Sequence, residues 1–147
     1  MTIFTRNVSS FRKLVGVVLF YTLLAPCCAQ AEIIVIVNAA NKAEIDDIAI
    51  ARIYLAEVKT FPGGSEAAAV EPEDGSVRAE FSDKLLKRAP AYIKSYWARQ
   101  KFTGGLKPLP QLSDDDAVIK YVMETPNAIG YVDSSKLRDG IRVVMRL

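Results

Sequence analysis

Residues 32–38 read Glu-Ile-Ile-Val-Ile-Val-Asn, and this stretch decides how the rest of the chain must pack. Five consecutive Ile and Val residues are typical of a β-strand, because branched side chains fit a pleated surface. A strand with one solvated face would alternate apolar and polar residues, whereas this run is apolar without a break. The stretch therefore predicts a strand that is buried on both faces and lies centrally in its sheet.

The first 31 residues have the organisation of a secretory signal peptide. Three basic residues precede an apolar run at 14–25, and the segment ends on Ala29-Gln30-Ala31, a small-x-small cleavage pattern. The run is short for a membrane span. We expect a periplasmic protein whose mature domain is residues 32–147. A retained anchor and a lipid attached to Cys27 are the alternatives, and the proline directly before that cysteine disfavours the lipid.

Cleavage of this segment changes the charge and the cysteine content. The formal net charge falls from +2 to about −1, because the three basic residues leave with the signal. No clustered positive charge then indicates nucleic acid as a partner. Both cysteines, Cys27 and Cys28, leave as well, so no disulfide is expected. The remaining 116 of 147 residues suit one domain with one core.

The residue types exclude several catalytic classes. The sequence holds no histidine, and its mature part holds no cysteine. Serine–histidine and cysteine–histidine nucleophile pairs and the usual zinc ligand sets are therefore excluded. We expect no cofactor and no metal site, and a protein that binds rather than catalyses.

Apolar spacing places the first helix and the next strand. Residues at helical spacing between an Asn41-led start and the Phe61-Pro62-Gly63-Gly64 turn predict a helix over 43–57. The apolar residues that carry this prediction are Ile45, Ile48, Ile53 and Leu55. Residues 67–70 are predicted to form a short strand.

The second half of the chain predicts three more helices and two more strands. Val77, Phe81 and Leu85 recur every four residues, which is typical of a buried helical stripe. Pro90 ends that helix and suits the first turn of the next one, which carries Ile93 and Trp97.

Ser113 and the three aspartates after it resemble the start of a further helix, with the serine as its cap and the acids near the positive end of the helix dipole. Residues 128–132 and 141–145 are predicted strands. Alternating strands and helices indicate an α/β domain with a mainly parallel or mixed sheet flanked by helices.

The order of these segments resembles the phosphate-type periplasmic substrate-binding proteins of ABC transporters. The residues that carry the resemblance are Ile53-Tyr54-Leu55, Phe61-Pro62-Gly63-Gly64, Phe81, Trp97, Phe102-Thr103-Gly104, Val118, Val122 and Pro126-Asn127-Ala128-Ile129-Gly130-Tyr131. The resemblance covers about residues 33–133. It implies a single lobe of a periplasmic-binding-protein-like fold, without the second lobe that closes on a ligand in two-lobed members.

The anion loop of that family departs from its pattern here. The family form is Arg-x-Asp-Gly-Ser-Gly-Thr before a helix, and anchoring on Phe81 aligns it with residues 71–77. The arginine becomes Glu71, the serine becomes Gly75 and the threonine becomes Val77. Because Glu71, Glu73 and Asp74 are expected to place three negative charges where a dianion would lie, family-type phosphate binding is disfavoured.

Two ligand sites remain as predictions. A shift of one residue allows a weak oxyanion site at the helix start, formed by Gly75, Ser76, Val77 and Arg78. The second lies in the turn after the first strand, where Asn38 and Asn41 have side-chain amides that can donate to a ligand. A plain helix start and an Asn41 helix cap are the structural alternatives.

Two functions follow from the resemblance. In the first, the chain is a non-catalytic solute-binding protein for a small anion such as phosphate and serves an ABC transporter. In the second, the lobe has lost its small ligand and is an interaction or sensory accessory of a membrane protein. A homodimer that supplies the missing lobe is compatible with both.

Overall fold

The computed structural model describes residues 32–73, 75–103 and 106–147. The predicted signal peptide at 1–31 and Asp74 of the predicted acidic loop lie outside the described residues. The described helices and strands are, in chain order, β1 (Ile33–Asn38), α1 (Asp47–Tyr54), β2 (Ala68–Ala69), β3 (Glu71–Pro72), α2 (Ser76–Lys84), α3 (Pro90–Thr103), β4 (Gln111–Leu112), α4 (Asp115–Glu124), β5 (Ala128–Asp133) and β6 (Ile141–Arg146). A short 3-10 turn, Ser134–Lys136, follows β5.

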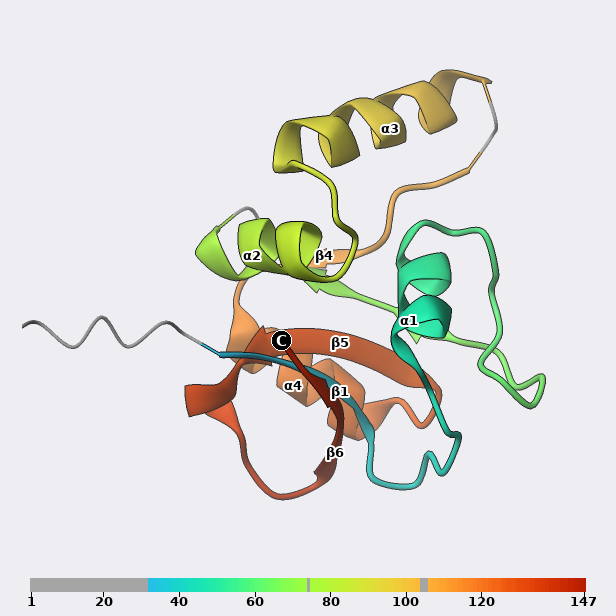
Figure 1. Cartoon of the computed structure of the whole chain (residues 1–147). Coiled ribbons are helices and arrows are strands. Elements are labelled where there is room, and N and C mark those ends of the chain that lie inside the picture. The colour runs from blue at the N-terminus through green and yellow to red at the C-terminus, as the bar shows by residue number, and fades with distance from the viewer. Residues whose placement is uncertain (1–31, 74, 104–105) are drawn as a thin grey trace, which may run out of the picture. The chain divides into compact units, whose positions relative to one another are not determined.

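β1 is an interior strand of a four-stranded sheet with the order β2-β5-β1-β6 (Figure 1). All six of its residues are buried, so the prediction of a central strand covered on both faces is confirmed. β1 pairs antiparallel with β5 and β6, whereas β2 and β5 pair in parallel. Of the two sheet types expected, the mixed one is present.

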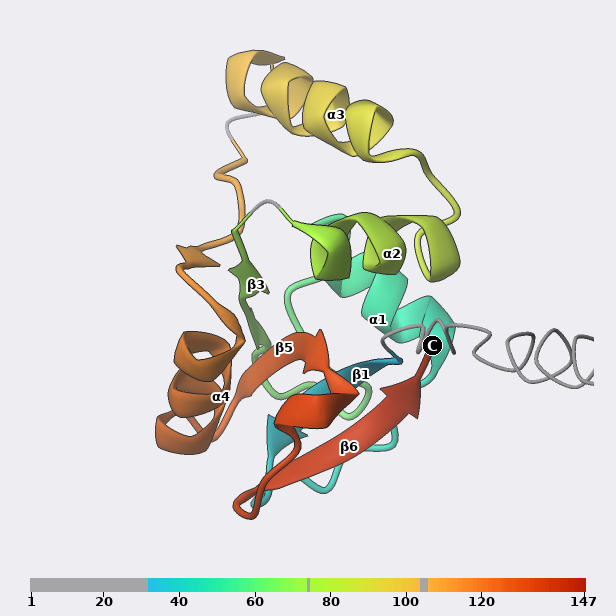
Figure 2. The ribbon, with the colours of Figure 1, turned by 90° about the vertical axis from the view of Figure 1, so that its left-hand side faces the viewer.

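Successive residues of β1 point to opposite faces of the sheet, as strand geometry requires. Ile33, Val35 and Val37 belong to a core cluster that includes residues of α1 and α2. Ile34 and Ile36 belong to a second cluster with residues of α4. Figure 2 shows α4 on one side of the sheet and α1 with α2 on the other. The run is apolar at every position because each face supports its own helical layer.

Gly130 in β5 marks the closest approach between the sheet and α4. A Cβ atom at this position would lie 2.6 Å from Cγ1 of Val118 and 3.3 Å from Cγ2 of Val122. Because packed interiors leave no room for such overlap, any side chain here would push α4 outward. The glycine of the Ala-Ile-Gly-Tyr segment is therefore a packing requirement of the fold.

α1 is shorter than the helix predicted over residues 43–57. Its N-cap is Asp46, whose carboxylate accepts a hydrogen bond from Ala49 N at 2.8 Å. The prediction of an Asn41-led start is therefore wrong. Oδ1 of Asn41 instead accepts from Ala43 N at 2.9 Å and closes a local turn before the helix.

The apolar face predicted for α1 is also partly wrong. Ile48 is 65% exposed, whereas Ile50 is fully buried. The error arose because Ile45 lies before the helix, so its spacing to Ile48 does not define a helical face. Ile53 is buried as predicted.

The later elements agree closely with the predictions. Phe81 is buried in α2, and Val77 and Leu85 pack beside it. α3 begins at Pro90 and buries Ile93 and Trp97. The strands predicted at 128–132 and 141–145 are β5 and β6. The sequence patterns did not predict the parallel pair of β3 with β4, which has only two residues in each strand.

α4 begins one residue later than its predicted serine cap implies. Asp114 is the N-cap, and its carboxylate accepts from Ala117 N at 2.8 Å. Ser113 was the predicted cap, and that prediction is wrong because the helix starts at Asp115. The two acids that follow, Asp115 and Asp116, lie in the first turn as expected.

Candidate functional site

The starts of α2 and α4 line one cavity of about 340 Å³. Each helix presents the positive end of its dipole there, which favours negative charge. The lining residues are Pro72, Glu73, Gly75, Ser76, Val77, Ser113, Asp114, Asp115, Asp116 and Lys136. Three of the predicted site residues, Gly75, Ser76 and Val77, therefore share this cavity. We call it the helix-start cavity.

The start of α2 retains one property of an anion site. Its N-cap is Gly75, in an extended conformation, and no side chain caps the helix. The first turn carries no acidic residue either. The amide groups of a helix start normally find a partner in a capping side chain, water or a ligand. This helix start offers backbone donors to the cavity without a capping side chain.

The other groups of the helix-start cavity oppose an anion. Among the described residues, it is lined by four carboxylates, from Glu73, Asp114, Asp115 and Asp116, and by one ammonium group, that of Lys136. That ammonium lies 3.5 Å from Oδ2 of Asp116, and Arg138 pairs with the same carboxylate. The amide of Ala117 at the start of α4 already donates to Asp114. The cavity is therefore acidic, and its lining cation is occupied.

Two carboxylates of the cavity differ in their environment. Partial burial raises the pKa of Asp115, although a hydrogen bond from Asp133 N at 2.9 Å works against this rise. The positive charge of Lys136 lowers the pKa of Asp116. Negative charge is therefore stabilised at the outer carboxylate and costs more at the inner one.

Glu71 does not contribute to this acidity, which corrects the expectation from the sequence. It is 6% exposed in β3, and its Oε1 accepts from Nη2 of Arg78 at 2.7 Å and from Nε2 of Gln111 at 3.2 Å. The register of β3 with β4 places Gln111 directly opposite Glu71. A buried carboxylate requires such donors, because an unpaired buried charge is costly.

Arg78 lies in α2, but it does not line the helix-start cavity. It binds Glu71 and lines hollows beside α3 and β4, together with Lys94. Gly75 also lines one of these hollows, whereas Ser76 and Val77 do not. Of the predicted site residues, Arg78 therefore shares a hollow with Gly75 but not the helix-start cavity with Ser76 and Val77.

Three aromatic rings pack close to the Glu71–Arg78 pair. Phe81 and Tyr131 stack with ring centroids 3.8 Å apart, and Tyr54 meets both rings edge-on. Tyr54 Oη donates to the carbonyl groups of Val70 at 3.1 Å and Ile129 at 3.3 Å. Burial, assisted by the charge of Glu71, raises the pKa of both tyrosines. The rings form core structure and not a contact surface.

The second predicted site, at Asn38 and Asn41, lies elsewhere. Nδ2 of Asn38 donates to the carbonyl groups of Val122 and Met123, each at 2.9 Å, and its Oδ1 accepts from Ala40 N at 2.9 Å. The amide thus closes the last turn of α4, about 15 Å along that helix from its start. Asn38 therefore serves the fold, and the two predicted sites do not come together.

The described residues, with gaps at 1–31, 74 and 104–105, hold no cluster of three or more acidic, histidine or cysteine side chains suited to a metal ion. In the same residues no helix has the length and apolarity needed to cross a membrane.

Sequence reasoning missed part of the helix-start cavity. The sequence pattern predicts helix caps at Asp114, Asp115 and Asp116, and it gives no signal for Lys136. Lys136 lies on the 3-10 turn after β5 and reaches the aspartates at the start of α4 only because α4 packs beside that strand. Gln111 was missed for the same reason, since its role depends on a two-residue strand pairing.

No family model and no curated protein matches this sequence. Solved structures do match in fold. The phosphate-bound substrate-binding protein of Clostridium perfringens superposes with a TM-score of 0.57 at 18% identity, over 78% of this chain and 45% of that one.

Two further structures give the same result. The ABC-type phosphate transport receptor of Vibrio cholerae has a TM-score of 0.56 at 13% identity, over 78% of this chain and 46% of that one. PstS of Borrelia burgdorferi has a TM-score of 0.53 at 17% identity, over 78% and 47%. The chain spans about half the length of these proteins. It has the fold of a single lobe of phosphate-type substrate-binding proteins, as the resemblance implied.

Proposed function

We propose that this chain is a non-catalytic, exported binding protein whose lobe has lost oxyanion capture and contacts a membrane protein of the transporter or sensor class. The fold of the phosphate-type substrate-binding proteins supports a binding role. The acidic lining of the helix-start cavity supports the loss of the oxyanion, because four carboxylates repel an anion at the place where the helix dipoles would attract it.

The single observation that carries this proposal is that the cationic side chains near the helix-start cavity already pair with carboxylates. Arg78 binds the buried Glu71, and Lys136 binds Asp116. Guanidinium and ammonium groups are the side chains that hold phosphate in proteins. A protein partner, in contrast, can meet exposed carboxylates with its own basic side chains, and such contacts chiefly give specificity and speed of association.

Photo-crosslinking from the exposed Ser76 tests the proposal in intact cell envelopes. The full chain carries a photoreactive residue at Ser76 in one sample and at the exposed Glu44, which does not line the helix-start cavity, in the matched control. We expect an adduct with one membrane protein from Ser76 and none from Glu44. Equal adducts from both positions, or none from either, would contradict a contact at this cavity.

Weak oxyanion binding at the start of α2 is the second candidate. It is favoured by Gly75, which leaves the first turn of α2 without a capping side chain. Titration of the protein with inorganic phosphate, followed by amide NMR shifts at Gly75, Ser76 and Val77, decides between the two. Saturable shifts at millimolar phosphate would support the second candidate. Silence at these amides, together with a Ser76 adduct, would support the first.

Variants that neutralise carboxylates of the helix-start cavity test whether these groups repel phosphate in the same titration. In the protein with Glu73→Gln and Asp116→Asn, two of the repelling carboxylates are neutral, and phosphate affinity should rise severalfold. The matched control, Glu44→Gln with Asp139→Asn, removes the same charge from exposed positions that do not line the cavity. An equal rise in both proteins would show that overall charge alone sets the affinity.

A further inference from the structure

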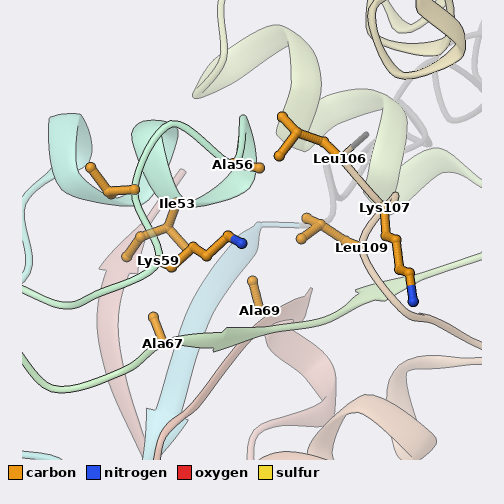
Figure 3. A pocket seen from close by; sticks show the side chains of 9 residues that line it. Ile53, Ala56, Lys59, Ala67, Ala69, Leu106, Lys107 and Leu109 are labelled. Atoms are coloured by element: carbon orange, nitrogen blue, oxygen red, sulfur yellow. The ribbon is translucent and has the colours of Figure 1, made fainter. Parts of the chain in front are cut away.

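A second cavity, of about 330 Å³, lies between the C-terminal end of α1, β2 and the segment that leads to β4 (Figure 3). Its lining residues are Ile53, Ala56, Val58, Lys59, Ala67, Ala69, Leu106, Lys107 and Leu109. It shares no residue with the helix-start cavity. We call it the α1–β2 pocket.

Most of the side chains that line the α1–β2 pocket are apolar. Seven of its nine lining residues are aliphatic, and three of the seven are alanines. Figure 3 shows Ala67 and Ala69 on one side of the space, with Leu106 and Leu109 on another. Small side chains facing large ones leave a hollow that an apolar group would fill favourably.

Lysine is the only charged residue type among the lining residues. The Lys59 side chain reaches over the hollow beside Ile53, and its ammonium group points toward the middle, whereas Lys107 points away (Figure 3). The lining contains no carboxylate, and within the part of the chain that the structure describes Lys59 forms no ion pair. A ligand in this pocket would therefore meet one cation and an apolar wall.

The volume limits the size of the ligand. A water molecule occupies about 30 Å³ in the liquid, so the pocket holds on the order of ten non-hydrogen atoms. An inorganic oxyanion would make no contact with the apolar side chains, and a neutral hydrocarbon would make no use of the Lys59 ammonium. A molecule with an apolar chain and one carboxylate uses both features.

We propose that the α1–β2 pocket binds a medium-chain aliphatic monocarboxylate, with its chain against the alanines and leucines and its carboxylate on Lys59. The charge-assisted hydrogen bond to the ammonium fixes the orientation of the ligand, and burial of the chain supplies most of the affinity. The site does not depend on the function of the helix-start cavity.

Titration of the full chain with octanoate tests the proposal, because octanoate has ten non-hydrogen atoms and one carboxylate. Amide NMR shifts should saturate at Ala67, Ala69 and Leu109 and leave Ser76 unchanged. Octanamide, which is neutral and of the same size, should bind about tenfold more weakly. Inorganic phosphate should cause no shift at these three residues. Absence of saturable shifts with octanoate at millimolar concentration would overturn the proposal.

Two variants separate the contributions of charge and space. Lys59→Met keeps most of the length of the side chain but removes its charge, and it should weaken octanoate binding about tenfold without affecting octanamide. The matched control is Lys120→Met on α4, an exposed lysine that does not line the pocket and should leave binding unchanged. Ala67→Leu should fill the hollow and abolish binding of both compounds, whereas Ala91→Leu, on the exposed surface of α3, should not.

The outcomes distinguish this proposal from its rivals. Unchanged octanoate affinity in Lys59→Met would show that Lys59 does not contact the carboxylate of the ligand. Equal binding of octanoate and octanamide would show the same. Binding of an acidic, leucine-rich peptide in place of octanoate would assign the pocket to a protein partner and overturn the proposal. Crosslinking from Ser76 is unaffected by any of these results, so failure here leaves the proposed function intact.

Discussion

Two neighbouring regions of this domain are held together by different interactions, one by close packing and the other by paired charges. Where α4 packs on β5, Gly130 leaves room for Val118 and Val122, so the size of the side chain decides which residue fits. Where β3 leads into α2, the carboxylate of Glu71 is balanced by Arg78, so charge decides. Packing tolerates few alternatives, because a single methyl group changes it. Charge balance can be restored by any nearby partner, so the site can change while the scaffold stays.

The largest expected effect concerns the Glu71–Arg78 pair. Glu71→Gln removes the negative charge from this mostly buried ion pair and should lower the free energy of unfolding by about 3 kcal/mol. Glu57→Gln removes one partner of the exposed pair with Arg52 and should cost less than about 1 kcal/mol. Urea denaturation measures both. Equal costs would show that the buried pair is no more important than a surface contact.

The close packing of α4 on β5 is tested at Gly130. Gly130→Ala places a methyl group against Val118 and should cost about 2 kcal/mol in urea denaturation, because the interior has no space for it. Gly75→Ala is the matched control, since its new Cβ would lie 3.9 Å from the nearest atom and its backbone is extended. If the two changes cost the same, close packing of α4 on β5 is not what requires the glycine.

The aromatic residues beneath Glu71 join the two regions and predict a pH dependence. Burial raises the pKa of Tyr54 and of Tyr131 above the ordinary tyrosine value of about 10 in the folded state. The unfolded chain ionises these tyrosines first as the pH rises, so their contribution to stability is complete below about pH 10 and decreases above it.

Each tyrosine should then cost up to about 1.4 kcal/mol for every pH unit above 10. Urea denaturation between pH 8 and pH 11.5 measures the slope. Tyr131→Phe should reduce the slope, whereas Tyr92→Phe, at an exposed ring, should not. A slope that is unchanged in Tyr131→Phe would argue against the burial of this hydroxyl group.

The smallest expected effect concerns the cap of α4. Asp114→Ala removes the acceptor for Ala117 N and should lower the free energy of unfolding by about 1 kcal/mol, while Ser113→Ala should change it by only a few tenths. The difference in urea midpoints is the measurement. A larger cost for Ser113→Ala would restore the serine cap that the sequence pattern predicts.

Elements that depend on local interactions were predictable from the sequence, whereas features that depend on contacts between distant segments were not. β1, β5 and β6 and the helices α2 and α3 were predicted because their apolar periodicity, or Pro90 in the case of α3, is a local property. The starts of α1 and α4 differ from the predicted ones, because several neighbouring residues are good caps and packing decides which of them is used. The pairing of β3 with β4 has too few residues to leave a pattern.

The candidate site was less predictable than the fold. The segment Gly75 to Val77 was correctly placed at a helix start, since a turn followed by an apolar stripe is a local pattern. The pairing of charges near the site was not predictable, because Glu71 meets Arg78 and Gln111 only when β3, β4 and α2 come together. The sequence predicts Asn38 as a ligand donor but does not indicate that its amide also bonds the end of α4, a contact between residues 84 positions apart.

The sequence by itself determined the central strand and the alternation of strands and helices, because these follow from side-chain shape and local backbone preference. Only the tertiary structure decided which charges meet. It paired Glu71 with Arg78, gathered four carboxylates at two helix starts and opened an apolar pocket beneath Lys59. Electrostatic pairing and cavities depend on distances between segments remote in the chain, and no local pattern records those distances.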